Sequence, residues 1–233
     1  MSKYKIVIDA GHGGKDSGAV GNSLKEKDIN LRVTLKVGKE LENLGYEVIY
    51  TRKTDLFLEL HQRANIANQS NADAFVSIHI NATENITAQG YETFSYPTSA
   101  KGARLAKDIH DSIIGAKLYT KNRGTKTANF AVLRQTKMPA ALIELGFITN
   151  KEDVQLMTSK EDEFVEAIVK GINKYFGVKE LEKDDIKGHW AEKEINKVIA
   201  EGVMIGDEKG FRPDEPVTRA ELAVVLSRLL EKK

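Results

Sequence analysis

The sequence contains no cysteine, and this absence excludes several kinds of site. Disulfides, cysteine-ligated zinc and a cysteine nucleophile are all ruled out. Any transition-metal site must therefore be built from histidine, aspartate and glutamate. Only five histidines are available for it: His12, His61, His79, His110 and His189.

Long apolar runs and an excess of one charge are also missing. No stretch approaches the roughly 18 apolar residues of a membrane span, and no apolar signal-peptide segment follows the basic N-terminus. We therefore expect a protein that is made in the cytoplasm, binds no membrane, and meets an extracellular substrate only after release. The formal net charge of +1 gives no sign of a nucleic-acid-binding surface.

Strand-like and helix-like segments alternate along residues 1–176, which we interpret as one large domain. The expected strands lie at 4–8, 46–51, 74–80, 91–96, 130–134 and 140–147, and the expected helices at 27–44, 58–69, 99–114 and 162–176. This alternation predicts an α/β fold with a mostly parallel, twisted sheet flanked by helices. Ligands of such sheets bind beyond the carboxyl ends of the strands.

The rest of the chain has a different character. Residues 177–185 are largely charged, lack periodicity and are interpreted as a linker. Residues 186–233 predict a small all-α hairpin, with helices at about 191–201 and 219–231. Thr218 and Glu221 have the spacing of a capping box for the second of these helices. Fewer than 50 residues are marginal for independent folding, so we expect this piece to associate with something.

Glu144 is the most informative residue because it interrupts the apolar stretch at 140–147. A carboxylate is rarely buried without a partner. His12 and His79 lie in similar strand-like surroundings, and a metal ion would serve all three. Zinc hydrolases commonly use three protein ligands and keep a fourth position for water. The pattern therefore indicates metal-assisted hydrolysis.

The third protein ligand should be a carboxylate near the start of the helix expected at 27–44. Glu26 is the best placed, but Asp9, Asp16 and Asp28 compete with it, and spacing alone does not separate them. Glu144 would be the general base, taking a proton from the attacking water and passing it to the leaving amine. Burial should raise its pKa.

The remaining histidines and the single tryptophan have less specific surroundings. His61 lies on a polar helix face and His110 within a charged helix, so we expect both to be solvated. His189 belongs to the small C-terminal piece and is expected to be structural. Trp190 is expected in the core of that piece.

At these residues the chain resembles the zinc-dependent N-acetylmuramoyl-L-alanine amidases of the amidase_3 family. The matching segments are IVIDAGHGG (6–14), KEKDINL (25–31), TRKTD (51–55), RANIAN (63–68), SIHINA (77–82), NFAVLR (129–134) and LIELGFITN (142–150). The resemblance implies one zinc ion held by His12, Glu26 and His79, with Glu144 as the catalytic acid/base. The implied substrate is peptidoglycan, cut between N-acetylmuramic acid and L-alanine.

The tail resembles a single surface-layer-homology (SLH) repeat, through GHWA (188–191), GFRP (210–213) and VTRAE (217–221). Such repeats are associated with binding secondary cell-wall polymers and usually come in threes. One copy suggests a homo-oligomer in which three tails form one binding unit. Arg219 is the residue expected to meet an anionic polymer.

Further expectations concern the substrate contacts and the biological setting. Arg63, Asn81 and Asn129 are candidate contacts to the sugar and the peptide. The expected setting is a phage endolysin, and the alternative is a sporulation or autolytic amidase released when the mother cell lyses. Two other functions compete: a zinc peptidase that cuts within the stem peptide, and a wall-binding protein without catalysis.

Overall fold

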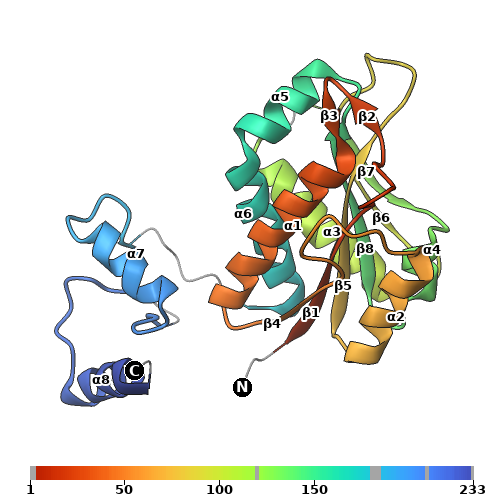
Figure 1. Ribbon diagram of the computed structural model, residues 1–233. Coiled ribbons are helices and arrows are strands. Elements are labelled where there is room, and N and C mark those ends of the chain that lie inside the picture. Colours follow the sequence, from red (N-terminus) through yellow and green to blue (C-terminus); the bar gives the residue numbers. More distant parts are fainter. Residues whose placement is uncertain (1–3, 119–120, 179–184, 208–209, 232–233) are drawn as a thin grey trace. The chain divides into compact units, whose positions relative to one another are not determined.

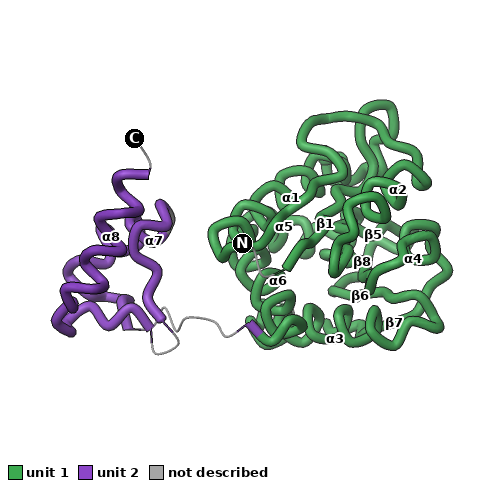
Figure 2. The backbone as a smooth tube through the Cα atoms, turned by 90° about the horizontal axis from the view of Figure 1, so that it is seen from below, with its two compact units in different colours: residues 1–177 green, residues 178–233 purple. Residues whose placement is uncertain are grey.

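The computed structural model describes residues 4–118, 121–178, 185–207 and 210–231. Its contacts divide the chain into unit 1, Met1–Gly177, and unit 2, Val178–Lys233, which are coloured separately in Figure 2. Most of the linker expected at 177–185 lies outside the described residues. Among the described residues, no helix is both long and apolar enough to cross a bilayer.

The described part of unit 1 alternates strands and helices (Figure 1). Its strands are β1 (Lys5–Ala10), β2 (Val20–Gly21), β3 (Leu24–Lys25), β4 (Glu47–Tyr50), β5 (Ala74–Asn81), β6 (Tyr91–Ser95), β7 (Asn122–Thr127) and β8 (Ala140–Phe147). Its helices are α1 (Glu26–Asn43), α2 (Leu60–Ser70), α3 (Ala100–Gly115), α4 (Ala131–Gln135), α5 (Lys151–Ser159) and α6 (Glu161–Phe176).

The main sheet confirms the α/β prediction. Its strand order is β4-β1-β5-β8-β6-β7, and the first four of these strands are parallel. Strand β6 runs antiparallel to β8, and β7 runs parallel to β6. Helices α1, α3 and α6 cover one face of the sheet, and the shorter helices α2 and α4 cover the other (Figure 1).

The core forms because the central strands are apolar on both faces. Residues 6–8 of β1 and 74–76 of β5 are fully buried, as expected for strands that lie between two helical layers. Helix α1 contributes one apolar stripe, Ile29, Val33 and Val37, at a spacing of four residues. His12 follows β1 and His79 lies near the carboxyl end of β5, so these two strands position two of the candidate site residues.

Two local predictions were wrong or incomplete. The strand expected at 130–134 is helix α4, in which Val132 and Leu133 are both buried, and the neighbouring strand lies earlier, at β7. A short apolar run does not distinguish a buried strand from a buried helical turn. Helix α5 was not expected at all. The Asn150 side chain caps it, accepting hydrogen bonds of 3.0 Å from the backbone of Glu152 and of Asp153.

Unit 2 contains α7 (Glu192–Ala200) and α8 (Arg219–Glu231), as the sequence predicts. The expected capping box is confirmed: Thr218 N–H donates to Glu221 Oε2 at 2.7 Å, and Glu221 N–H donates to Thr218 Oγ1 at 3.2 Å. The buried hydrophobic side chains of the described part of the unit are Ile186, Ile195 and Val203.

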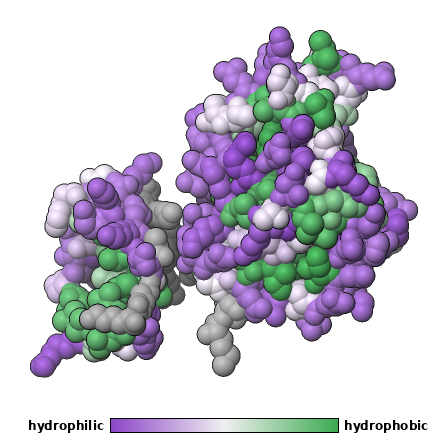
Figure 3. All heavy atoms as spheres, viewed as in Figure 1, coloured by the Kyte–Doolittle hydropathy of each residue, from purple (hydrophilic) through white to green (hydrophobic). Residues whose placement is uncertain are grey.

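Helix α8 buries none of its described residues, and its apolar side chains lie on the surface of unit 2 (Figure 3). The exposed ones are Leu222, Val224, Leu226, Leu229 and Leu230. The prediction of Trp190 in the core was wrong, because its side chain is 88% exposed. The small aliphatic core of the unit leaves this indole uncovered.

Candidate metal centre

Three side chains converge beyond the carboxyl ends of β1 and β5. His12 follows β1, Glu26 begins α1, and His79 lies near the end of β5, and their donor atoms lie within 4.8 Å of one another. Glu26 Oε1 is 3.2 Å from His12 Nε2 and 3.0 Å from His79 Nδ1. Two imidazoles and one carboxylate facing a common point are a donor set that suits zinc.

Glu26 is held ready as a ligand by the backbone around it. The side chain is buried, Oε2 accepts a hydrogen bond of 2.8 Å from Ala19 N–H, and Oε1 accepts one of 3.0 Å from Ile80 N–H. Burial alone would raise the pKa of Glu26, but the hydrogen bonds from His12 and His79 outweigh it and hold that pKa well below its usual range. The carboxylate is therefore ionised.

The competing aspartates have other roles. Asp9 is fully buried, where it accepts hydrogen bonds from Thr51 Oγ1 at 2.5 Å and Ser77 Oγ at 2.6 Å. Asp16 Oδ2 lies 2.8 Å from His12 Nδ1. This contact orients the ring and leaves Nε2 to face Glu26, as carboxylates do behind metal-binding histidines. Asp28 is exposed on α1.

Glycine makes room for the converging rings. A Cβ on Gly11 would lie 2.3 Å from the imidazole of His79. A Cβ on Gly18, whose φ is +62°, would lie 2.6 Å from Glu26 Oε2 and 2.7 Å from the ring of His12. Both positions therefore require glycine for the three donors to meet.

Arg63 supports the site from behind, and the prediction that it contacts substrate was wrong. The residue is 2% exposed, and Nη1 lies 2.9 Å from Asp9 Oδ1 and 2.6 Å from the carbonyl of Ala10. Nη2 donates to the carbonyl of His12 at 2.6 Å. Arg52 works beside it, donating to the carbonyl of Ala10 at 2.9 Å. Both guanidiniums thus fix the turn that carries His12.

Glu144 lies next to this cluster, directly opposite His79 in the register of β5 and β8. Its Oε2 is buried and finds no hydrogen-bond partner among the residues that the structure describes. Burial raises the pKa of Glu144 well above its usual range, and the nearby Glu26 and Glu92 carboxylates raise it further. A carboxyl group of this kind is suited to exchanging protons near neutral pH.

The other candidate contacts lie on the β6–β7 side. Asn81 is half-buried, and its Nδ2 donates to Glu92 Oε1 at 2.7 Å. Asn129 is exposed, and its Oδ1 accepts from Arg134 Nη1 at 2.7 Å. Both side chains have protein partners, and their contact with substrate stays a prediction. Arg219, in unit 2, is exposed.

The remaining histidines lie apart from this cluster. His61 is exposed, as expected. The prediction of a solvated His110 was wrong, since it is 4% exposed, stacks on Tyr91 at 5.0 Å and holds Asn122 Oδ1 at 2.8 Å through Nε2. The charged residues next to His110 in the sequence suggested an exposed position, but α3 places His110 on the face that packs against β6 and β7. His189 has the structural role expected, because its Nδ1 accepts from the backbone N–H of Ala191 at 3.2 Å.

Sequence reasoning missed Glu92, which is buried on β6. The signal was present, because Glu92 is an acid between Tyr91 and Thr93 in a strand, as Glu144 is in its own strand. Only the pairing of β6 with β8 brings the two acids together.

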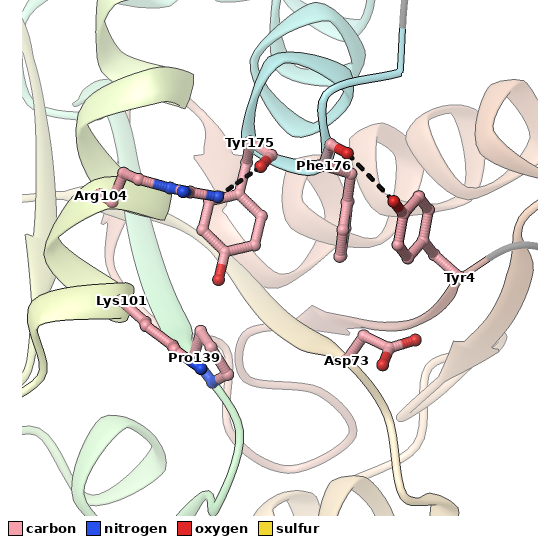
Figure 4. A pocket seen from close by; sticks show the side chains of 7 residues that line it. All are labelled: Tyr4, Asp73, Lys101, Arg104, Pro139, Tyr175 and Phe176. Atoms are coloured by element: carbon pink, nitrogen blue, oxygen red, sulfur yellow. Dashed lines mark hydrogen bonds between the residues drawn. The ribbon is translucent and has the colours of Figure 1, made fainter.

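A separate pocket of about 360 Å³ lies at the amino ends of the parallel strands (Figure 4). It is lined by Tyr4, Asp73, Lys101, Arg104, Pro139, Tyr175 and Phe176. Two of its polar side chains bond to the backbone of α6: Tyr4 Oη donates to the carbonyl of Phe176 at 3.1 Å, and Arg104 Nη2 donates to that of Tyr175 at 2.6 Å. The pocket contains none of the metal-site residues and is a poorer candidate for catalysis.

Comparison with known proteins agrees with this geometry. The sequence model of the N-acetylmuramoyl-L-alanine amidase family matches residues 6–174, and that of the S-layer homology domain matches residues 184–223. The chain is 46% identical over 178 residues to the endolysin of Bacillus phage SPP1, a match that covers 73% of this chain and 64% of the endolysin.

Two further relatives are similar to unit 1. The sporulation-specific N-acetylmuramoyl-L-alanine amidase of Bacillus subtilis is 39% identical over 170 residues, which are 72% of this chain and 64% of that protein. The crystal structure of an N-acetylmuramoyl-L-alanine amidase from Clostridium difficile 630 superimposes with a TM-score of 0.73 at 36% identity, covering 77% of this chain and all of that one. The chain therefore belongs to the N-acetylmuramoyl-L-alanine amidase family and carries an S-layer homology domain.

Proposed function

We propose that this chain hydrolyses the amide bond between N-acetylmuramic acid and L-alanine in peptidoglycan, with one zinc ion held by His12, Glu26 and His79. The observation that carries the proposal is the convergence of these three donors beside Glu144, whose buried Oε2 has no partner among the described residues. Zinc bound there would supply Lewis acidity, which polarises the scissile carbonyl and lowers the pKa of water.

The residues of the chain account for the proton transfers. Glu144 takes the proton from the attacking water, and its raised pKa makes it a competent acceptor. The same carboxyl then gives the proton to the nitrogen of the departing L-alanine. Asp16 and Arg63 hold His12 in place throughout, because both bond to it outside the donor cluster.

The experiment is digestion of purified cell walls by the intact chain, with and without a chelator. Glu144→Gln keeps the size of the side chain but removes the proton acceptor, so we expect a loss of about a hundredfold or more in turnover with zinc retained. Glu84→Gln is the matched control, because Glu84 is exposed in the loop after β5. Full activity of zinc-free protein would overturn the proposal.

The fragments released in the same digestion separate the competing chemistries. An amidase releases intact stem peptides that begin with L-alanine, and mass analysis identifies them. A zinc peptidase would leave L-alanine on the sugar. A wall-binding protein without catalysis would release nothing, although the complete set of ligands and base favours turnover.

For unit 2 we propose binding to a secondary cell-wall polymer, with Arg219 facing the anionic chain, and association of three copies through α8. The exposed apolar side chains of α8 support the association, because they present an unpaired apolar surface. Light scattering of the full chain tests it: Leu226→Glu should reduce a trimeric mass to a monomeric one. A monomeric wild-type chain at every concentration would exclude this association.

For the biological setting we propose a phage endolysin that reaches the wall when the host membrane fails. The identity of 46% to an endolysin, against 39% to a sporulation-specific amidase, supports this choice. A gene for a holin-like membrane protein beside this one would agree with it. Expression confined to sporulating cells would favour the mother-cell amidase instead.

A further inference from the structure

A buried carboxylate lies on the far side of Glu144 from the metal ligands. Glu92 of β6 is paired in register with Glu144 of β8, so the two side chains lie on the same face of the sheet. Directly opposed residues of antiparallel strands have Cβ atoms about 4.5–5.5 Å apart. Because His79 is the partner of Glu144 on the other side, the three side chains form a row across β5, β8 and β6.

Two cations hold Glu92 in this row. Arg123 Nε lies 3.1 Å from Glu92 Oε2, and Lys126 Nζ pairs with the same oxygen, while Asn81 donates to Oε1. Glu92 is 3% exposed, but the side chains of Arg123 and Lys126 are 29% and 42% exposed. One carboxylate thus serves two cations, and the trio presents a surplus positive charge to solvent next to Glu144.

The aromatic neighbours restrict where these cations can lie. The Arg123 guanidinium lies over the ring of Phe147 at 4.9 Å, and Lys126 Nζ lies over the ring of Phe94 at 5.9 Å. Charged side chains on an edge strand such as β7 commonly prevent aggregation. Preventing aggregation does not require a buried carboxylate shared by two cations. Here Glu92 fixes Arg123 and Lys126 beside Glu144, the carboxyl group that transfers the proton.

The proton transfer proposed for Glu144 indicates which part of the substrate would contact Arg123 and Lys126. Glu144 gives its proton to the departing amine, so the peptide that carries this amine lies on the Glu144 side of the metal ligands. The next strands on that side are β6 and then β7 (Figure 1). The Glu92 carboxylate beside Glu144 would repel an anionic peptide if Arg123 and Lys126 did not stand beside it.

We propose that Arg123 and Lys126 form a subsite for a free carboxylate on the stem peptide, close to the scissile amide, with Glu92 as the residue that positions both cations. This inference rests on the proposed amidase function and specifies its substrate. A guanidinium and an ammonium group are both suited to binding a carboxylate. The subsite prefers peptides in which this carboxylate is free to those in which it is converted to a carboxamide.

The experiment compares two soluble muramoyl peptides that are identical except that the second residue carries a free carboxylate or a carboxamide. The intact zinc-loaded chain should show a kcat/KM at least about tenfold higher for the free carboxylate, a ratio that corresponds to one strong charge-assisted contact. Arg123→Gln and Lys126→Gln should each reduce this ratio towards one, mainly through KM. Glu92→Gln, which releases both cations, should raise KM for the carboxylate peptide more than it lowers kcat.

Lys137→Gln is the control, since Lys137 is exposed and precedes β8, and it should leave the ratio unchanged. Equal losses on both peptides, or no preference in the wild type, would overturn the subsite. If the wild type cleaves neither peptide, the amidase proposal fails instead. In that case calorimetry measures the Kd of each peptide for the Glu144→Gln protein. A lower Kd for the free-carboxylate peptide would support the subsite, and equal Kd values would overturn it.

Discussion

Arg63 donates a hydrogen bond of 2.6 Å to the backbone carbonyl of His12, a residue whose φ is +60°. Residues other than glycine rarely adopt this left-handed backbone conformation. It costs on the order of 1–3 kcal/mol and persists only where the surrounding structure enforces it. Arg63 also pairs with the fully buried Asp9, so one guanidinium connects the strand interior to the turn that presents the imidazole.

Replacing Arg63 by alanine should therefore be severely destabilising. The substitution leaves Asp9 buried without its cation, and the free energy of unfolding should fall by about 3–5 kcal/mol in denaturant titrations. Arg134→Ala is the matched control, because Arg134 is exposed on α4, and it should change stability by less than about 1 kcal/mol. Comparable stability of the two variants would contradict a supporting role for Arg63.

Asp16→Asn should weaken zinc binding without unfolding the chain. Asp16 fixes the ring of His12 through Nδ1, and loss of such a contact typically costs about 10–100-fold in metal affinity. Competition with a chelator of known affinity measures the change. Asp28→Asn is the control, since Asp28 is exposed on the first turn of α1. An equal loss of zinc affinity in that variant would show that Asp16 does not act through its contact with His12.

His110 should make unfolding depend on pH. Burial lowers its pKa below the ordinary value of about 6.5, so the unfolded chain binds the proton first as pH falls. The contribution of His110 to the free energy of unfolding is therefore complete above pH 6.5. It declines below that pH, by up to about 1.4 kcal/mol per pH unit, until the pKa of the folded state is reached.

Urea titrations of wild type and His110→Gln at pH 7.5 and 5.5 measure this contribution. The wild type should lose more stability between the two values than the variant does. His61→Gln, at an exposed position, should behave like the wild type. A variant that loses as much stability as the wild type would show that His110 is not the group responsible.

Gly171→Ala should disrupt the packing of α3 on α6. A Cβ at this position would lie 2.3 Å from the Cα of Ile109, and a backbone atom cannot move aside cheaply. We expect destabilisation by about 1–3 kcal/mol, measured as a lower Tm. Gly115→Ala, at the exposed end of α3 with nothing within 4 Å of its Cβ, should leave stability unchanged or raise it by up to about 1 kcal/mol.

The sequence was most informative where polarity conflicts with its surroundings. Glu144 within an apolar strand and two histidines at strand ends indicated a metal site, and the structure brings all three residues together with Glu26. Long helices such as α1 and α6 were predicted to within one or two residues of their ends, because an apolar stripe over several turns has few alternatives.

The errors arise where tertiary contacts decide. Arg63 was expected to contact the substrate, and only the packing of α2 against the turn after β1 reveals its buried partners. His110 and Glu92 depend in the same way on β6, whose antiparallel pairing no local pattern indicates. Residues 130–134 were too short an apolar segment for periodicity to distinguish helix from strand.

The reversed direction of β6 determines where the chain could be lengthened to restrict the access of substrate to the metal ligands. Because β6 runs against β5 and β8, the connection from β5 to β6 does not need to cross the sheet, and residues 82–90 stay at the rim where the ion would bind. Extra chain inserted there would lie close to the metal ligands and would leave the pairing of the strands intact. The connection between β5 and β6 is therefore a place where a segment covering the metal ligands could be gained or lost by simple changes of length.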